Sequence, residues 1–258
     1  MCSGDRAVTL TVKKAMDILD CLAGARTSMS CSEIARRLEM PRSTTYRLLS
    51  TLTVGGYVLS EGDGLGKEYR LGFKILELAS SVLDGMALRR SALPLLRELR
   101  DVTEETVHLV VADRGQVTYI EKVDSLKTVR MHSAVGRRGF MHSTAVGKAM
   151  LAYRQHEVDA VVEENGLFAL TPKTITDRET LLGELAIVRK QGYAVDDGEN
   201  EDGIRCVAAP IFDHQGEVVA AVSASGPAFR FSLDRLRELS GTVKGTGLEI
   251  SRRLGYLG

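Results

Sequence analysis

Five residues within one six-residue stretch carry side chains suited to contact DNA. They are Arg42, Ser43, Thr44, Tyr46 and Arg47. Guanidinium groups bond phosphates or the acceptor edge of guanine, and hydroxyl groups reach phosphates or bases. The same residues also suit the solvated face of a helix that binds nothing, so the surrounding elements must decide between the two interpretations.

The elements predicted around this cluster form a helix-turn-helix. Ser30 and Glu33 have the spacing of a capping box, which predicts that a helix begins there. Pro41 ends that helix near Met40 and suits the first turn of a second helix. The core-facing positions of the second helix are Thr45, Leu48, Leu49 and Leu52. The cluster then lies on the opposite face, which in a helix-turn-helix enters the major groove.

A β-hairpin is predicted directly after the two helices. Two β-prone runs, residues 57–59 and 69–71, flank the glycine-rich residues 61–68. This hairpin would be the wing of a winged helix-turn-helix, and its Lys67 and Arg70 are available for phosphates. The sequence predicts binding to double-stranded operator DNA through Arg42, Ser43, Thr44, Tyr46, Arg47 and Lys67.

The distribution of charge along the chain agrees with this prediction. Of 34 Lys+Arg and 34 Asp+Glu, residues 1–75 hold 11 and 8, a balance of +3. The other residues hold 23 and 26, a balance of −3. A mildly basic segment joined to a mildly acidic body suits a protein in which only one part contacts DNA.

Composition narrows the class of protein further. With 258 residues, 44% of them hydrophobic, the chain can build packed cores in about two domains. No apolar run approaches the ~18–20 residues of a membrane span, so no membrane partner is expected. The cysteines at positions 2, 21, 31 and 206 form no CxxC pair and are expected as reduced thiols in a cytoplasmic protein. The five histidines lack metal-ligand spacing, so neither a metal nor a cofactor is expected.

Three parts are predicted along the chain. Residues 1–72 form the winged helix-turn-helix, which begins with an amphipathic helix over residues 12–22. Residues 73–90 form a linker helix whose apolar side chains wrap more than one face, so it is either buried in its own chain or paired with a second copy. We expect pairing into a homodimer or a dimer of dimers, because dimers read two half-sites. Residues 91–258 form the second domain.

The second domain is predicted to be α+β with a mainly antiparallel sheet. Its strands are expected at residues 107–112, 116–123, 128–132, 204–212 and 218–225. Its helices are expected at residues 142–154, 155–165, 177–192 and 233–254.

Seven segments resemble those of the IclR family of bacterial transcriptional regulators, in the same order and essentially from end to end. They are EIARRLEMPRSTTYRLLSTL, YRLG, ETVHL, HSTAVGKAML, RKQGYAVDDGE, GIRCVAAPIFD and SASGP. The resemblance implies an N-terminal winged helix and a C-terminal GAF-like effector-binding domain. One position departs from the pattern, because Thr45 stands in the second helix where an aliphatic residue is usual.

The resemblance also implies a pocket for a small organic-acid effector in the second domain. The matching positions are Ala145, Val146, Asp196, Cys206, Ser223 and Ser225. A helix start near Ala145 would attract a carboxylate. Ser223 and Ser225 alternate on one strand, so both hydroxyl groups project from the same face. Without the resemblance, the serines would equally suit a solvated strand face.

Other residues of this region have two open interpretations. Cys206 is compact enough to leave room for a ligand, yet it also suits a small core position. Asp196 could accept a bond from a ligand hydroxyl or hold a pocket loop. His142 is a further candidate for the pocket rim, and Arg205 is expected to be structural because it alternates to the opposite sheet face from Cys206.

The predicted function is a DNA-binding transcriptional regulator of a catabolic operon, controlled by the effector. Repression is expected, although the residues leave activation open. Two alternatives are an architectural DNA-binding protein that senses no ligand, and a small-acid enzyme with Cys206 as its nucleophile. The enzyme is disfavoured because the chain has no GxSxG elbow and no histidine placed by sequence beside Cys206.

Overall fold

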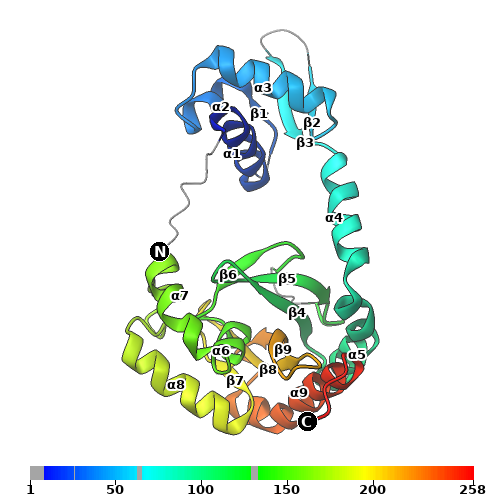
Figure 1. The fold of residues 1–258 in the computed structure, drawn as a ribbon, viewed down its shortest axis with the longest axis vertical. Coiled ribbons are helices and arrows are strands. Elements are labelled where there is room, and N and C mark those ends of the chain that lie inside the picture. Colours follow the sequence, from blue (N-terminus) through cyan, green and yellow to red (C-terminus); the bar gives the residue numbers. More distant parts are fainter. Residues whose placement is uncertain (1–8, 26, 63–65, 129–132) are drawn as a thin grey trace. The chain divides into compact units, whose positions relative to one another are not determined.

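The chain divides into two units, residues 1–85 and residues 86–258 (Figure 1). The computed structural model describes residues 9–25, 27–62, 66–128 and 133–258. None of the helices in these ranges is long and apolar enough to cross a membrane.

The N-terminal unit is a helix-turn-helix followed by a β-hairpin and a further helix. Its elements are α1 (Leu10–Gly24), β1 (Met29–Ser30), α2 (Cys31–Arg37), α3 (Arg42–Val54), β2 (Val58–Glu61), β3 (Glu68–Leu71) and α4 (Lys74–Gly85). The strands form an antiparallel sheet in the order β1-β3-β2. The two-residue strand β1 was not predicted, because it is too short to show an alternating pattern.

Local interactions fix where α2 and α3 begin. The predicted capping box is present: Ser30 Oγ accepts the N–H of Glu33 at 3.3 Å, and the N–H of Ser30 donates to Glu33 Oε2 at 2.8 Å. Glu39 turns the chain with a φ of 50°. Pro41 then precedes α3 in an extended conformation. These contacts lie within a dozen residues, which is why the sequence predicts them.

A small hydrophobic core holds α1, α2, α3 and the hairpin together. Ile18, Ile34, Leu49 and Val58 are fully buried in it. Thr45 is also fully buried, and its hydroxyl donates to the carbonyl of Pro41 at 3.2 Å. The hydroxyl that departs from the family's aliphatic pattern is therefore satisfied within its own helix.

The C-terminal unit is α+β, with a six-stranded antiparallel sheet in the order β6-β5-β4-β9-β8-β7. The strands are β4 (Thr106–Asp113), β5 (Gln116–Val123), β6 (Arg138–Phe140), β7 (Ala194–Asp196), β8 (Ile204–Phe212) and β9 (Val218–Pro227). The helices are α5 (Ala87–Thr103), α6 (Ala145–Leu151), α7 (Val158–Asn165), α8 (Arg178–Gln191) and α9 (Leu233–Arg253), with a 3-10 turn at Gln155–Glu157 before α7.

Helices cover both faces of this sheet. On one face, α9 packs against Ala209 and Val222, and α5 lies beside α9 (Figure 1). On the opposite face, α6 and α8 share a hydrophobic core with Ala208 and Ala221. This second face also carries the polar side chains of the candidate ligand site.

The predicted fold class is confirmed, including the winged helix-turn-helix and the antiparallel sheet. The predicted bounds of β8 agree with the structure, and β9 extends two residues beyond its prediction. The edge strands β6 and β7, of three residues each, were missed. The strand expected at residues 128–132 falls almost wholly on residues 129–132, which lie outside the described ranges.

Gly147 allows α6 to approach the preceding loop closely. A Cβ at this position would overlap the backbone of Met141, whereas Gly183 on α8 has no atom within 4 Å of its Cβ position. We expect Gly147→Ala to lower the free energy of unfolding by about 1–3 kcal/mol because of this overlap. Gly183→Ala should raise it by about 0.5–1 kcal/mol, because it gains helix propensity without a clash. Denaturant unfolding of both variants checks this, and equal effects would contradict it.

Candidate functional site

Helix α3 presents the predicted DNA contacts on its surface. Arg42, Ser43, Tyr46 and Arg47 are exposed, and Thr44 is half-buried. The buried Thr45 and Leu49 hold the opposite side of α3 in the core. Core packing thus fixes which side chains α3 offers to a partner.

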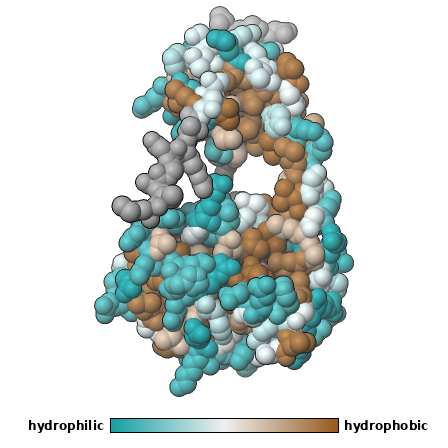
Figure 2. Space-filling view, viewed as in Figure 1, coloured by the Kyte–Doolittle hydropathy of each residue, from teal (hydrophilic) through white to brown (hydrophobic). Residues whose placement is uncertain are grey.

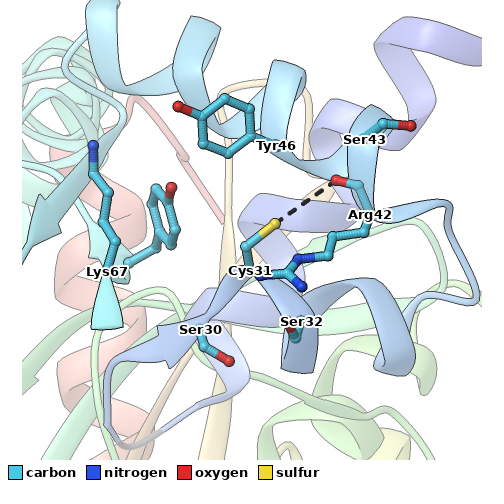
Figure 3. A pocket seen from close by; sticks show the side chains of 8 residues that line it. Ser30, Cys31, Ser32, Arg42, Ser43, Tyr46 and Lys67 are labelled. Atoms are coloured by element: carbon cyan, nitrogen blue, oxygen red, sulfur yellow. Dashed lines mark hydrogen bonds between the residues drawn. The ribbon is translucent and has the colours of Figure 1, made fainter. Parts of the chain in front are cut away.

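A groove of about 420 Å³ runs between the starts of α2 and α3 and the hairpin (Figure 3). Its lining residues are Ser30, Cys31, Ser32, Arg42, Ser43, Tyr46, Lys67 and Tyr69. Figure 3 shows Lys67, just before β3, and Tyr46 of α3 among the side chains that line the groove. Tyr46 also lines a second groove with Thr44 and Arg47. Through these two grooves all six predicted DNA contacts share one surface.

The groove contains residues that the sequence analysis did not select. Cys31 is buried at the start of α2, where its thiol donates to the carbonyl of Arg42 at 3.8 Å, and burial raises the pKa of this thiol. On the hairpin, Arg70 is engaged by Glu61, with Nε and Nη2 at 2.9 and 2.7 Å from Oε1. Lys67 is therefore the hairpin cation that lines the groove.

In the C-terminal unit, strand register brings the predicted effector residues together. Asp196 pairs with Cys206, and Cys206 pairs with Ser225, so the three form a row across β7, β8 and β9. Ser223 and Ser225 face the same side of β9, because each hydroxyl lies 3.5 Å from His108 Nδ1. The predicted common face of the two serines is thus confirmed.

Helix α6 begins near the predicted helix start, at Ala145, and is shorter than the helix expected over residues 142–154, because it ends at Leu151. Thr144 caps it by accepting the N–H of Gly147 at 3.1 Å, and its own hydroxyl donates to the carbonyl of Phe140 at 2.7 Å. Ala145 and Val146 are buried in the core that α6 shares with the sheet.

A cavity of about 280 Å³ opens beside these residues. Its lining residues are Tyr119, Ser133, Arg137, Arg138, Gly139, Phe140, Thr144, Leu170, Asn200 and Glu201. None of the six predicted effector residues lines this cavity. Ala145 directly follows the lining residue Thr144, and Asp196 accepts the N–H of the lining residue Asn200. The lining carries the guanidinium groups of Arg137 and Arg138, hydroxyl and amide groups, and the carboxylate of Glu201. Guanidinium, hydroxyl and amide groups suit a small carboxylate with further oxygen atoms.

Asp196 holds a loop of the cavity wall. Its Oδ1 accepts the N–H of Glu199 at 2.6 Å and the N–H of Asn200 at 3.3 Å. Burial raises the pKa of Asp196 to about 7, and the charge of Glu199 adds to this effect. Of the two roles open from the sequence, the structure supports loop holding.

A buried lysine ties this loop to α6. Lys148 is 1% exposed, and its Nζ lies 2.6 Å from Glu199 Oε1 and 3.4 Å from Glu184 Oε1. Ser143 Oγ donates to Asn200 Oδ1 at 3.1 Å and joins the same two walls. A lysine within the apolar run AVGKAMLA was a signal of a buried charge that the sequence analysis did not use.

The remaining candidates have structural roles. His142 Nε2 lies 3.1 Å from the carbonyl of Phe168, and burial lowers the pKa of this histidine. Arg205 contacts Asp197 and the carbonyls of Ala228 and Phe231, as expected for a structural residue. Burial, together with the charge of Asp196, raises the thiol pKa of Cys206 well above its usual value, so Cys206 is not an activated nucleophile. Within the described residues, no group of three or more His, Cys, Asp or Glu side chains could hold a metal ion.

Both units match models of one protein family. The IclR helix-turn-helix domain matches residues 11–62, and the C-terminal domain of the bacterial transcriptional regulator IclR matches residues 80–252.

Individual proteins are similar over nearly the whole chain. The HTH-type transcriptional regulator KdgR of Escherichia coli strain K12 is 40% identical over 247 residues, 95% of this chain and 93% of that protein. The transcriptional repressor IclR of the same strain is 34% identical over 248 residues, 95% and 90% of the two chains. A crystal structure of an IclR homologue from Microbacterium hydrocarbonoxydans in complex with 4-hydroxybenzoate is 26% identical, with a TM-score of 0.78 over 95% of this chain and 98% of that chain.

Substitution of Arg47 tests the predicted DNA contacts on α3. Because it is exposed on α3, we expect Arg47→Ala to weaken binding to the promoter DNA beside its own gene about ten- to a hundredfold. Thermal melting should stay unchanged. The matched control is Arg237→Ala, which removes an exposed arginine of α9. Gel shifts measure both variants, and an unchanged affinity for Arg47→Ala would remove α3 from the interface.

The Lys148–Glu199 pair allows a test of how the ligand-site walls are joined. Lys148→Met leaves the Glu199 carboxylate buried without its cation, so we expect a loss of about 3–5 kcal/mol in unfolding free energy. The double variant Lys148→Met/Glu199→Gln should recover most of that loss, because the remaining carboxylate, that of Glu184, is 29% exposed and stays hydrated without its cation. Arg178→Ala, which breaks the exposed pair with Asp159, should leave the free energy of unfolding nearly unchanged, because water screens both charges. A double variant as unstable as Lys148→Met would contradict this account.

Proposed function

This chain belongs to the IclR family of bacterial transcriptional regulators, and we propose that it represses a catabolic operon under the control of a small organic acid. The N-terminal unit would bind operator DNA, and the C-terminal unit would bind the acid. The observation that carries the proposal is the shared surface of Arg42, Tyr46 and Lys67, which joins α3 to the hairpin. Because its proposed target is operator DNA, the protein would act in the cytoplasm.

The DNA interface is proposed to consist of Arg42, Ser43, Thr44, Tyr46, Arg47 and Lys67. α3 would enter the major groove, because its exposed side carries the groups that bond base edges. Lys67 would neutralise a phosphate on the flank and so add to affinity without adding sequence preference.

The effector is proposed to be a small organic acid, bound in and behind the cavity beside α6. Its site would comprise Ala145, Val146, Asp196, Cys206, Ser223 and Ser225, together with the cavity lining. Arg137 gives this lining a partner for a carboxylate, and Ser133 and Asn200 offer hydrogen bonds to further oxygen atoms. The related protein from Microbacterium hydrocarbonoxydans, which is complexed with 4-hydroxybenzoate, supports the same class of ligand.

The linker helix α4 is proposed to pair with a second copy of the chain, in a homodimer or a dimer of dimers. None of the residues of α4 (Lys74–Gly85) is buried within the chain. Phe73, Leu76 and Val82 are 69%, 65% and 60% exposed, and Figure 2 shows apolar side chains along this helix. A second copy would bury them and place two reading helices for two half-sites.

The expectation that the chain is not an enzyme is confirmed by the family, whose matched members are transcriptional regulators. The architectural alternative, DNA binding without a ligand, differs from the proposal in one measurable property. A ligand that binds the folded chain raises its stability, by about 2.7 kcal/mol at a hundredfold excess over Kd. A thermal-shift screen against organic acids, 4-hydroxybenzoate among them, therefore separates the two. Stabilisation supports the sensor, and the absence of any shift supports the architectural alternative.

Ser223 and Ser225 are proposed to make promoter binding respond to the acid. We expect Ser223→Ala/Ser225→Ala to abolish the effect of the acid on promoter binding while DNA affinity without the acid stays unchanged. The control is Ser240→Ala on α9, whose hydroxyl donates to the carbonyl of Arg237 within the same helix. Gel shifts with and without the acid measure the response. A normal response in the double variant would mean that the acid binds elsewhere.

A further inference from the structure

We infer that His108 is a positioning residue that makes the Ser133 hydroxyl a hydrogen-bond donor into the cavity. Ser223 and Ser225 would then act on the ligand through this ring. The inference rests on the proposed function, because it assigns a role within the same ligand site. It also narrows the ligand class to acids that place an acceptor oxygen against Ser133.

His108 stands between the serine pair and the cavity. It lies on the central strand β4 and is 2% exposed. Its Nε2 lies 2.7 Å from Ser133 Oγ, and its Nδ1 lies 3.5 Å from both Ser223 Oγ and Ser225 Oγ. Ser133 lines the cavity, whereas neither Ser223 nor Ser225 does. The imidazole is therefore the connection between the serine pair and the cavity wall.

The ring and its partner are both held in place. Tyr119 packs edge-on against the imidazole, with ring planes at 81°. Lys122, which pairs with His108 across β5, donates from Nζ to the backbone carbonyl of Ser133 at 2.8 Å. With the ring plane and the Ser133 backbone fixed, the main remaining freedom is the position of the protons.

The imidazole is neutral, and this restricts the pattern of protons. Burial lowers the pKa of His108 to about 3, and the Lys122 charge adds to the effect. A neutral imidazole has one N–H donor and one acceptor nitrogen. When one of the two serine hydroxyls donates to the single lone pair of Nδ1, the ring proton lies on Nε2 and is donated to Ser133 Oγ.

This pattern determines what Ser133 offers a ligand. Because Ser133 Oγ accepts from Nε2, its own O–H is left to donate into the cavity. The opposite tautomer would use that O–H on Nε2 and turn oxygen lone pairs toward the ligand, which would repel a carboxylate. The Nε2–H tautomer therefore suits an acid held between Ser133 and Arg137.

The proton pattern can be measured directly in the full-length protein without a ligand. With 15N-labelled histidine, two-bond 1H–15N spectra distinguish the tautomers, and His108→Phe assigns the signal among the five histidines. We expect the neutral Nε2–H tautomer, and a shift toward the other tautomer in Ser223→Ala/Ser225→Ala. The inference would be overturned if His108 in the native protein carried its proton on Nδ1 or were charged. It would also be overturned if the tautomer stayed the same in Ser223→Ala/Ser225→Ala.

A second experiment tests the consequence for binding, with 4-hydroxybenzoate as the probe. We expect His108→Phe and Ser133→Ala each to lower its affinity about tenfold, the effect of one lost hydrogen bond, and the double variant to lose no more. Promoter affinity without the probe and thermal melting report whether each variant folds. If His108→Phe does not fold, Ser133→Ala alone still tests the predicted loss of affinity for the probe. If the double variant lost affinity by the product of the two single losses, His108 and Ser133 would act independently, which would overturn the inference. If the native protein does not bind the probe, that counts against the proposed ligand class, and the tautomer measurement alone decides the relay.

Discussion

The ion pair between Lys148 and Glu199 is the interaction on which the proposed ligand site depends. A lysine that is 1% exposed must keep a partner, since an unpaired buried charge is strongly destabilising. Lys148 belongs to α6, and Glu199 belongs to the loop that Asp196 holds after β7. The pair therefore joins the helix start at Thr144 to the wall that carries Asn200 and Glu201. The walls of the cavity then have a fixed separation, which a site that selects small ligands requires.

The proposed DNA-binding surface depends on contacts of another kind. Its helices are set by a capping box and a proline, which act over three or four residues, and by a small core around Ile34 and Leu49. The sequence could predict this part almost completely because each signal acts on its own neighbours. The same local signals placed Arg42 to Arg47 on the exposed side of α3.

The proposed ligand site was only partly predictable, because pairing between distant segments of the chain builds it. The serine pair and Cys206 came from a resemblance, and strand register places them on one face as expected. The cavity itself is lined by other residues, such as Ser133 and Asn200, from segments without a regular pattern. His108 touches residues 25 and 117 positions away, which no local period reveals. Its one visible signal was a polar residue inside the buried run VHLVV.

The central claim is that one molecule couples DNA binding to ligand binding, and such coupling is reciprocal. The most direct test is calorimetric titration of the free protein and of its complex with promoter DNA, with the acid found by thermal shift. The account predicts that DNA changes the affinity for the acid by the same factor as the acid changes the affinity for DNA, about 5–150-fold. Equal affinities for the acid in both titrations would contradict it.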